Sequence, residues 1–281
     1  MYSSIYDDAI LGGMNMLLYR VTVLMDNNVI GTKRELESEH GLSMFIETPD
    51  STFLFDCGHT GLAWENARKM GIDLSAVKNV VLSHSHYDHA GGFPALLKYC
   101  QLEAVYTGRN FWQEKYSYDK ENDEYQYKGC GFTKKDLDSW GIEQRVCRSI
   151  LPLDDYANVV TGFDKHYDFE TIPAKFVRGE GKVPDPFDDE ICVLLPEGDG
   201  LAMVVGCSHV GILNMVATVM ERTELPVYSV MGGIHLVGGE ERIDRTMQEL
   251  ERLGVENFNL CHCSGINNMA TGSVIEVQCQ D

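Results

Sequence analysis

The chain has 281 residues, 44% of them hydrophobic and 23% charged, which is typical of a globular protein with a sizeable core. Its formal net charge of −20 disfavours nucleic acid and anionic membranes as partners. The longest apolar runs have the length of a strand, so the sequence predicts no membrane-spanning segment.

No internal repeat or linker divides the chain, and we expect a single domain over residues 14–281 after a loose N-terminal extension, residues 1–13. The first residues lack the basic start of a secretory signal, and the nine cysteines are scattered without a framework spacing. These features together indicate reduced thiols and a cytoplasmic location.

The N-terminal part of the chain alternates short apolar runs with polar turns. It predicts an antiparallel meander of three strands over residues 17–25, 44–48 and 52–56. A helix over residues 62–70 follows the turn Asp56-Cys57-Gly58 and ends at Gly71.

A fourth strand, residues 80–82, ends in four potential metal ligands, namely His84, His86, Asp88 and His89. Because alternate side chains of an extended chain share a face, His84, His86 and Asp88 are expected to face one pocket. Imidazole and carboxylate ligands suit zinc first, with iron or manganese as alternatives. Two divalent cations about 3.5–4 Å apart would share the cluster, with His84 and His86 on one and Asp88 and His89 on the other, and a single cation is the alternative.

After a turn at Gly91-Gly92, a helix over residues 94–100 and a strand over 104–107, the segment 109–131 is polar and unusually aromatic. It predicts a β-hairpin. Its Tyr116 and Tyr118 are candidate substrate contacts, either in a lid or on a stacking platform for a flat ring. The alternative is a solvated hairpin whose tyrosines pack on the rest of the domain.

The segments that follow carry few ligand types. Residues 133–140 predict a short helix with a near capping box. Residues 142–167 predict short strands, and His166 near their end reads as a surface histidine when taken alone. The acidic loop 180–189 is expected to border the pocket or to be partly mobile.

The C-terminal half repeats one pattern three times: an apolar strand, a turn and a histidine. His209 follows residues 201–205, His235 follows residues 227–231 and a glycine turn, and His262 follows residues 258–260. Helices over residues 212–221 and 243–253 separate these strands, which predicts a second βαβ half facing the first.

The order His84-x-His86-x-Asp88-His89 resembles the HxHxDH signature of the metallo-β-lactamase superfamily, and with the later histidines the resemblance extends over nearly the whole chain. It implies an α/β (α+β) fold, a four-layer αββα sandwich with a dinuclear metal site between two sheets. His209 and His262 would then complete the two ligand sets, and Asp56 would support the metal-binding loop from behind.

The chain departs from that superfamily at the residue that usually bridges the metals, an aspartate. Here the comparable turn is Gly206-Cys207, with His209 two residues later. Either Cys207 or His209 takes this role, or hydroxide alone bridges. If His209 takes it, His166 would be the third ligand of the first metal. Cys261 and Cys263 flank His262 and are expected to point away from it as packing residues.

The motifs Gly-Cys-Ser-His, Gly-Gly-Ile-His-Leu and His-Cys-Ser-Gly resemble a subgroup named after the synthase that joins a dihydropterin to ribofuranosylaminobenzene phosphate. Most members of this subgroup are described only as metal-dependent hydrolases of unknown substrate. The resemblance therefore implies the fold more specifically than the reaction.

The first functional expectation is a hydrolase in which metal-bound hydroxide attacks a small phosphorylated or ester substrate. Asp88 would orient the nucleophile as well as bind metal, and His235 would stabilise the developing charge or the leaving group. Asn27, Asn28 and His40 are weaker candidates for substrate contacts. The alternatives are a synthase-like transferase with a pterin-like, anionic substrate and a non-hydrolytic redox or sensing protein; the sequence predicts no oligomeric state.

Overall fold

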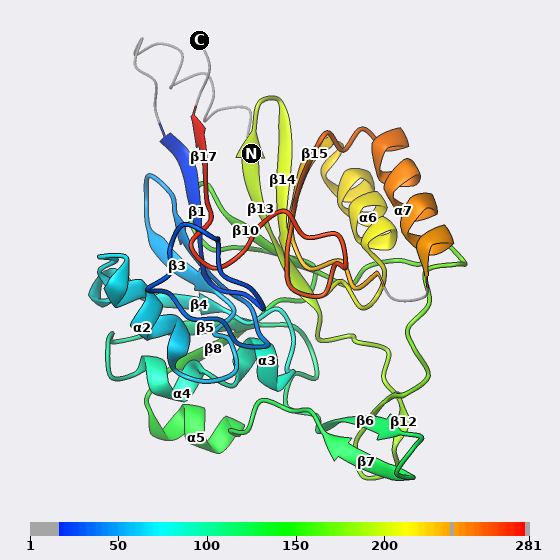
Figure 1. Ribbon diagram of the computed structural model, residues 1–281, viewed down its shortest axis with the longest axis horizontal. Coiled ribbons are helices and arrows are strands. Elements are labelled where there is room, and N and C mark those ends of the chain that lie inside the picture. The colour runs from blue at the N-terminus through cyan, green and yellow to red at the C-terminus, as the bar shows by residue number, and fades with distance from the viewer. Residues whose placement is uncertain (1–16, 237–238, 279–281) are drawn as a thin grey trace.

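A computed structural model describes residues 17–236 and 239–278 (Figure 1). The predicted N-terminal extension, residues 1–13, lies outside the described residues. Two β-sheets pack face to face, and helices cover the outer face of each sheet. This is the predicted four-layer αββα sandwich.

The first sheet has seven strands in the order β17-β1-β2-β3-β4-β5-β8. Strands β1, β2 and β3 form the predicted antiparallel meander, and β3, β4, β5 and β8 run parallel. Its strands are β1 (Leu17–Met25), β2 (Ser43–Glu47), β3 (Thr52–Phe55), β4 (Asn79–Val81), β5 (Ala104–Thr107), β8 (Glu143–Val146) and β17 (Val274–Gln278). The helices of this half are α2 (Leu62–Lys69), η1 (Leu74–Ala76), α3 (Tyr87–Ala90), α4 (Phe93–Leu96) and α5 (Lys134–Ser139).

The second sheet has six strands in the order β16-β15-β14-β13-β10-β9. Strands β14, β15 and β16 are parallel and are joined through α6 and α7, as the histidine-bearing pattern predicts. Its elements are β9 (Ile150–Pro152), β10 (Asn158–Thr161), β13 (Ile191–Glu197), β14 (Gly200–Val205), α6 (Ile212–Thr223), β15 (Val227–Gly232), α7 (Glu240–Arg252) and β16 (Asn257–Leu260).

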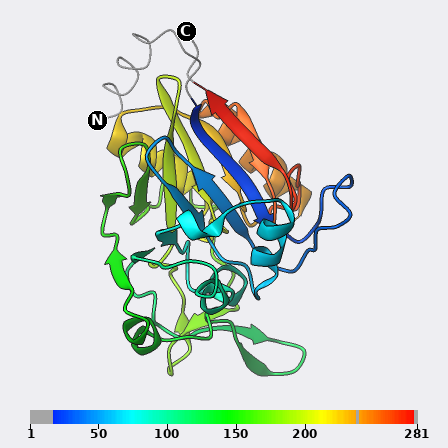
Figure 2. The same cartoon turned by 90° about the vertical axis from the view of Figure 1, so that its left-hand side faces the viewer.

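A third, smaller sheet in the order β12-β11-β6-β7 lies at the end of the molecule opposite the described chain ends (Figure 2). The predicted aromatic hairpin is formed by β6 (Lys115–Asp119) and β7 (Glu124–Tyr127). Two short strands extend it, β11 (Phe176–Arg178) and β12 (Val183–Pro184). Neither was predicted, because strands of three and two residues are too short to show a hydrophobic periodicity.

The main core lies between the two large sheets. There Val21 and Phe53 of the first sheet belong to the same fully buried cluster as Val193 and Val204 of the second. Strand β13 is buried over its first six residues, as expected for a strand covered on both faces. Fully burying each such side chain contributes roughly 1.5–3 kcal/mol, so the sandwich is a rigid platform for the loops at its end.

Two local predictions need comment. The helix expected over residues 94–100 is shorter, since Lys98 and Tyr99 donate to the carbonyls of Ala95 and Leu96 in tighter turns. The capping box of α5 is present: the Thr133 side chain and Asp136 bond to each other's backbone N–H. None of the helices within residues 17–236 and 239–278 is long and apolar enough to cross a membrane.

Candidate metal centre

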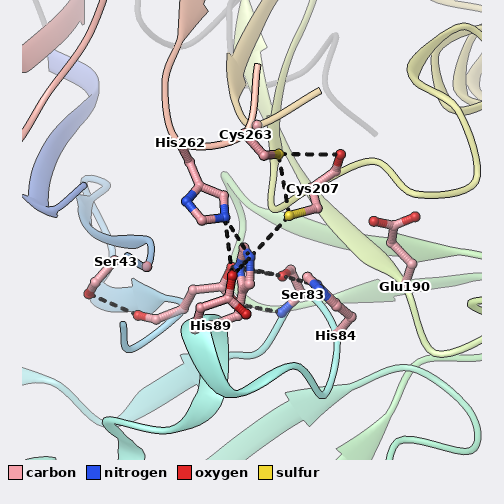
Figure 3. Close-up of polar contacts among 12 residues, drawn as sticks. Ser43, Ser83, His84, His89, Glu190, Cys207, His262 and Cys263 are labelled. Atoms are coloured by element: carbon pink, nitrogen blue, oxygen red, sulfur yellow. Dashed lines mark hydrogen bonds and ion pairs between the residues drawn. The ribbon is translucent and has the colours of Figure 1, made fainter. Parts of the chain in front are cut away.

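Potential metal ligands gather at one end of the sandwich, where β4, β14, β15 and β16 end (Figure 3). Within the described residues, five groups of three side chains have ligand atoms that all lie within 4.8 Å of one another. These groups are His84–His86–His209, Asp88–His89–His262, His84–His89–Cys207, Cys207–His209–His235 and Cys207–His262–Cys263.

The first trio, His84, His86 and His209, is almost completely buried. Burial and the neighbouring imidazoles lower the pKa values of His84 and His209, and burial lowers the pKa of His86 to about 3. The rings are therefore neutral, the form that binds metal. His84 Nε2 and both ring nitrogens of His209 have no hydrogen-bond partner among the described residues. Since an unpaired buried polar atom costs about 1–3 kcal/mol, these atoms fit a cation that would use them.

The second trio is Asp88, His89 and His262. Asp88 Oδ2 lies 3.5 Å from His262 Nε2 and 3.9 Å from His89 Nε2, and the two Nε2 atoms are 3.2 Å apart. Burial lowers the pKa of His262, but the negative charges of Cys263 and Asp88 outweigh it and raise this pKa to about 9. The second trio thus also fits a cation, which would have to displace a proton.

Asp88 does not reach the cluster by strand alternation, as the sequence analysis expected. Strand β4 ends at Val81, and Asp88 and His89 lie in the short helix α3, where the His89 and Ala90 amides donate to the His86 carbonyl. The same four ligands converge, but a helical turn brings in the last two.

Asp56 supports the candidate ligands that follow β4. Its carboxylate accepts hydrogen bonds from the backbone N–H and the hydroxyl of Ser83, each at 2.7 Å, and its Oδ2 lies 2.6 Å from His89 Nδ1. With Nδ1 so held, His89 presents Nε2 to the cluster. Gly206 packs directly against this support, because a Cβ there would lie 2.1 Å from Ser83 Oγ.

Asn27 has a comparable place behind His262, and its role as a substrate contact stays a prediction. Its Oδ1 lies 3.1 Å from His262 Nδ1, its Nδ2 donates to the His262 carbonyl, and the neighbouring Asp26 accepts the His262 backbone N–H at 2.6 Å. Asn28 is exposed, and its side chain does not line the pocket beside the cluster.

A pocket of about 830 Å³ opens beside the cluster, and the third sheet forms its opposite wall. Tyr118 and Phe176 lie on that wall with three lysines, Lys120, Lys128 and Lys175. His40 lies on the cluster side, with its Nε2 3.2 Å from Asp88 Oδ2. Asp119 and Glu121 lie on the same wall, so one space touches both ligand trios and a wall of aromatic, basic and acidic side chains.

Comparison with known proteins agrees with this architecture. A profile of the metallo-β-lactamase superfamily matches residues 38–126. The 7,8-dihydropterin-6-methyl-4-(β-D-ribofuranosyl)-aminobenzene-5'-phosphate synthase of Methanocaldococcus jannaschii is 29% identical over 247 residues, with 81% of this chain and 82% of that protein covered. A crystal structure of a metal-dependent hydrolase of the β-lactamase superfamily superposes with a TM-score of 0.75 at 27% identity, covering 92% of this chain and 99% of that one. The chain is thus similar in sequence to members of the metallo-β-lactamase superfamily and shares their fold.

A more distant structure, human tRNase Z (short form), shares the superfamily fold with a TM-score of 0.53 at 13% identity, covering 91% of this chain and 98% of that one.

Cys207 occupies the turn where the sequence analysis looked for a bridging group of the superfamily. Its Sγ lies 3.1 Å from His89 Nε2 and 3.3 Å from Cys263 Sγ, and Figure 3 shows it between Cys263 and His89. Cys207 belongs to three of the five ligand groups. The structure therefore brings this sulfur beside both trios, while His209 lies with His84 and His86.

Cys263 corrects a prediction. It was expected to point away from His262, yet it lines the pocket and contacts Cys207. Side chains do not alternate here because His262 has a left-handed backbone (φ 55°), so the chain is not extended at this point. Ser208 and His235 are also left-handed, with φ of 57° and 41°; such strain costs about 1–3 kcal/mol per residue and is concentrated at functional sites. Cys261 is a core residue, as predicted.

Two other candidates lie away from the cluster. His166 Nε2 faces Glu221 at 3.7 Å, so the alternative in which His166 is a third metal ligand is wrong. Tyr116 donates its hydroxyl to Glu114 and stacks under the Lys182 ammonium, so its side chain is occupied outside the pocket lining. His235, by contrast, lines the pocket and its ring lies 4.4 Å from that of His209.

The sequence analysis missed a group of buried residues beneath the centre. Lys115 Nζ lies 2.6 Å from Asp189 Oδ1 and 2.7 Å from Asp185 Oδ2, so part of the acidic loop is buried and paired. Phe187 stacks on His209 with ring centroids 4.0 Å apart. Glu190 accepts one hydrogen bond each from the backbone N–H groups of His209 and Val210. These contacts join segments far apart in the chain, and no local pattern announces them.

Proposed function

We propose that the chain is a metal-dependent hydrolase of a small phosphorylated or ester substrate, with zinc as the first candidate metal and iron or manganese as alternatives. The observation that carries this proposal is the pair of buried ligand trios facing one pocket, with Cys207 beside both. Similarity to a metal-dependent hydrolase of the β-lactamase superfamily supports it.

The chain's residues have distinct tasks in this proposal. His84, His86 and His209 would hold one cation, and Asp88, His89 and His262 a second. When bound, a divalent cation would supply a Lewis acid and would lower the pKa of a coordinated water toward neutrality. Burial raises the pKa of Asp88, but the neighbouring histidines outweigh it and lower this pKa well below its usual range.

The ionised Asp88 can accept a hydrogen bond from the nucleophile and so orient it. His235 has no hydrogen-bond partner for either ring nitrogen among the described residues. In this proposal His235 would donate to charge that develops on the substrate or on its leaving group.

The pocket wall favours an anionic substrate. No ion pair is present for Lys120, Lys128 or Lys175 within the described residues, although the chain carries a net charge of −20. The same lining carries Asp119 and Glu121, and Lys128 donates to the Gln126 amide oxygen. The three ammonium groups, together with the bound cations, would attract a phosphate or carboxylate group. Replacing them with glutamine is expected to raise KM by about tenfold, or about 1.4 kcal/mol, with less effect on kcat. Lys135→Gln, on the exposed side of α5, is the matched control.

Metal content and turnover measured on one sample test the hydrolase proposal. Protein purified without chelator is expected to hold about two equivalents of metal and to hydrolyse bis(p-nitrophenyl) phosphate. His84→Ala should lose both metal and turnover, whereas His166→Ala, outside the cluster, should keep them. One equivalent or less without turnover of simple esters would overturn dinuclear hydrolysis.

A second candidate is a synthase-like transferase acting on a pterin-like substrate. The relative that is 29% identical is a synthase whose name includes a dihydropterin and a phosphate, and Tyr118 and Phe176 on the pocket wall offer faces for a flat ring. Strong quenching of pterin fluorescence by the protein, lost in Tyr118→Ala, would favour the transferase if the protein also hydrolysed no ester. Binding without any turnover would instead favour a sensing protein.

A further inference from the structure

Cys207 and Cys263 form a thiol pair at the edge of the metal centre. Their Sγ atoms are 3.3 Å apart, and both residues line the pocket (Figure 3). They come from separate loops, one after β14 and one after β16. Each loop contains a residue with a left-handed backbone, Ser208 in the first and His262 in the second. The other described cysteines lie in apolar core clusters and outside the pocket lining; they are Cys57, Cys100, Cys130, Cys147, Cys192 and Cys261.

We propose that Cys207 and Cys263 are a redox modification site: they close into a reversible disulfide when the centre is metal-free, and this disulfide prevents full metal loading. A disulfide has an S–S distance of about 2.05 Å, so the two sulfurs need to approach by only roughly 1.3 Å. The inference rests on the proposed metal centre, but it does not depend on hydrolysis.

Metal binding and disulfide formation compete for the same sulfur atom. Cys207 Sγ lies within 4.8 Å of ligand atoms from both trios, so a thiolate there can serve as a ligand. A disulfide sulfur is no longer a thiolate. The oxidised pair therefore removes the one sulfur that lies beside both cation positions, while a bound cation keeps Cys207 from reacting.

Hydrogen peroxide is a sufficient oxidant. Cys263 is the more accessible of the two thiols, so its thiolate attacks the peroxide oxygen, the O–O bond breaks, and hydroxide leaves. The Cys207 thiolate then attacks the sulfenic sulfur of Cys263, forming the S–S bond and releasing a second hydroxide. The two thiol protons and the two hydroxides give two waters, and the two electrons lost by the sulfurs reduce the peroxide. A dithiol reductant reverses the reaction by thiol–disulfide exchange.

Peroxide treatment of the full chain, metal-free and zinc-loaded, tests the inference. The metal-free protein is expected to lose two free thiols and the mass of two hydrogens, and to yield one cross-linked peptide pair containing Cys207 and Cys263. It should then bind at least twofold less zinc until dithiothreitol is added. The zinc-loaded protein should form the link at least tenfold more slowly. Sulfinic acid without a cross-link, a different cysteine pair, or equal rates in both samples would overturn the inference.

Two variants keep the test decisive. Cys263→Ser should bind the same amount of zinc before and after peroxide, whatever its own starting value, and Cys100→Ser should cross-link like the parent chain. A Cys263→Ser protein whose zinc binding still falls after peroxide would overturn the inference. Failure of the untreated parent chain to bind zinc would instead overturn the proposed metal centre, so the two failures are distinguishable.

Discussion

Asp189 and Glu190 are adjacent in the sequence, yet they support candidate ligands from different sheets. We call the ligands that follow strands of the first sheet the first half of the metal centre, and those that follow strands of the second sheet the second half. Asp189 Oδ2 accepts hydrogen bonds from the backbone N–H and hydroxyl of Ser85, at 3.0 and 3.1 Å, and so holds the loop between His84 and His86. Glu190 accepts the backbone N–H groups of His209 and Val210, at 2.8 and 2.9 Å. One dipeptide just before β13 therefore fixes the ligands of both sheets relative to each other.

The two carboxyl groups are stabilised by different means. Burial raises the pKa of both, but at Asp189 the Lys115 ammonium, 2.6 Å from Oδ1, opposes the rise. At Glu190 the opposing interactions are mainly the two backbone N–H bonds, and the pKa rises to about 8. The first half of the centre thus depends on a buried ionic group, and the second half on a carboxyl that is largely protonated near neutral pH in the metal-free protein.

The largest expected effect follows from removing the buried cation. Lys115→Met leaves Asp185 and Asp189 buried without their partner, which typically costs 3–5 kcal/mol. Urea unfolding of the metal-free protein should show a loss of about this size, and zinc binding should weaken because the Ser85 loop loosens. The exposed Lys135→Met is the control and should stay within about 0.5 kcal/mol. Equal stability of the two variants would show that the ion pairs of Lys115 with Asp185 and Asp189 contribute nothing to the free energy of unfolding.

The adjacent pair offers a matched comparison of smaller size. Asp189→Asn removes a charged acceptor from Lys115 and Ser85, and hydrogen bonds to charged groups contribute about 1.5–3 kcal/mol each. Glu190→Gln removes a carboxyl that is mostly neutral below pH 8 and loses about one neutral hydrogen bond, about 0.5–1.5 kcal/mol. At pH 7, unfolding curves should therefore show the greater loss for Asp189→Asn. The reverse order would contradict the contrast between the two halves.

Much of the fold could be predicted because most strands at the centre of the two large sheets are short apolar runs between polar turns, and three strands in the C-terminal half of the chain end near a histidine. The HxHxDH order alone located His84, His86, Asp88 and His89. Local sequence could not reveal the Lys115–Asp189 pair, because the two residues are 74 positions apart and neither carries a pattern.

Cys263 was beyond prediction for a different reason. Its direction depends on the left-handed backbone at His262, and a histidine gives no local signal of positive φ as a glycine would. The hydrogen bond between Asn27 and His262 was also not predicted, since a polar triplet after a strand does not indicate which distant side chain it contacts. The sequence thus predicted which histidines and which aspartate cluster better than it predicted the residues that hold them in place.

The smallest expected effect comes from the neutral support in the second half. Asn27→Ala removes the hydrogen-bond partner of His262 Nδ1 and the donor to the His262 carbonyl, which should lower the free energy of unfolding by about 1 kcal/mol. Loss of such outer support typically weakens metal binding 10–100-fold, so zinc titration should show one weakened equivalent and one unchanged. Asp56→Ala, the corresponding change behind His89, should cost more in both measurements, because it removes a fully buried carboxylate that bonds Ser83 twice. If Asn27→Ala weakened both equivalents alike, the two trios would act as one site, and the assignment of His262 to one cation alone would fail.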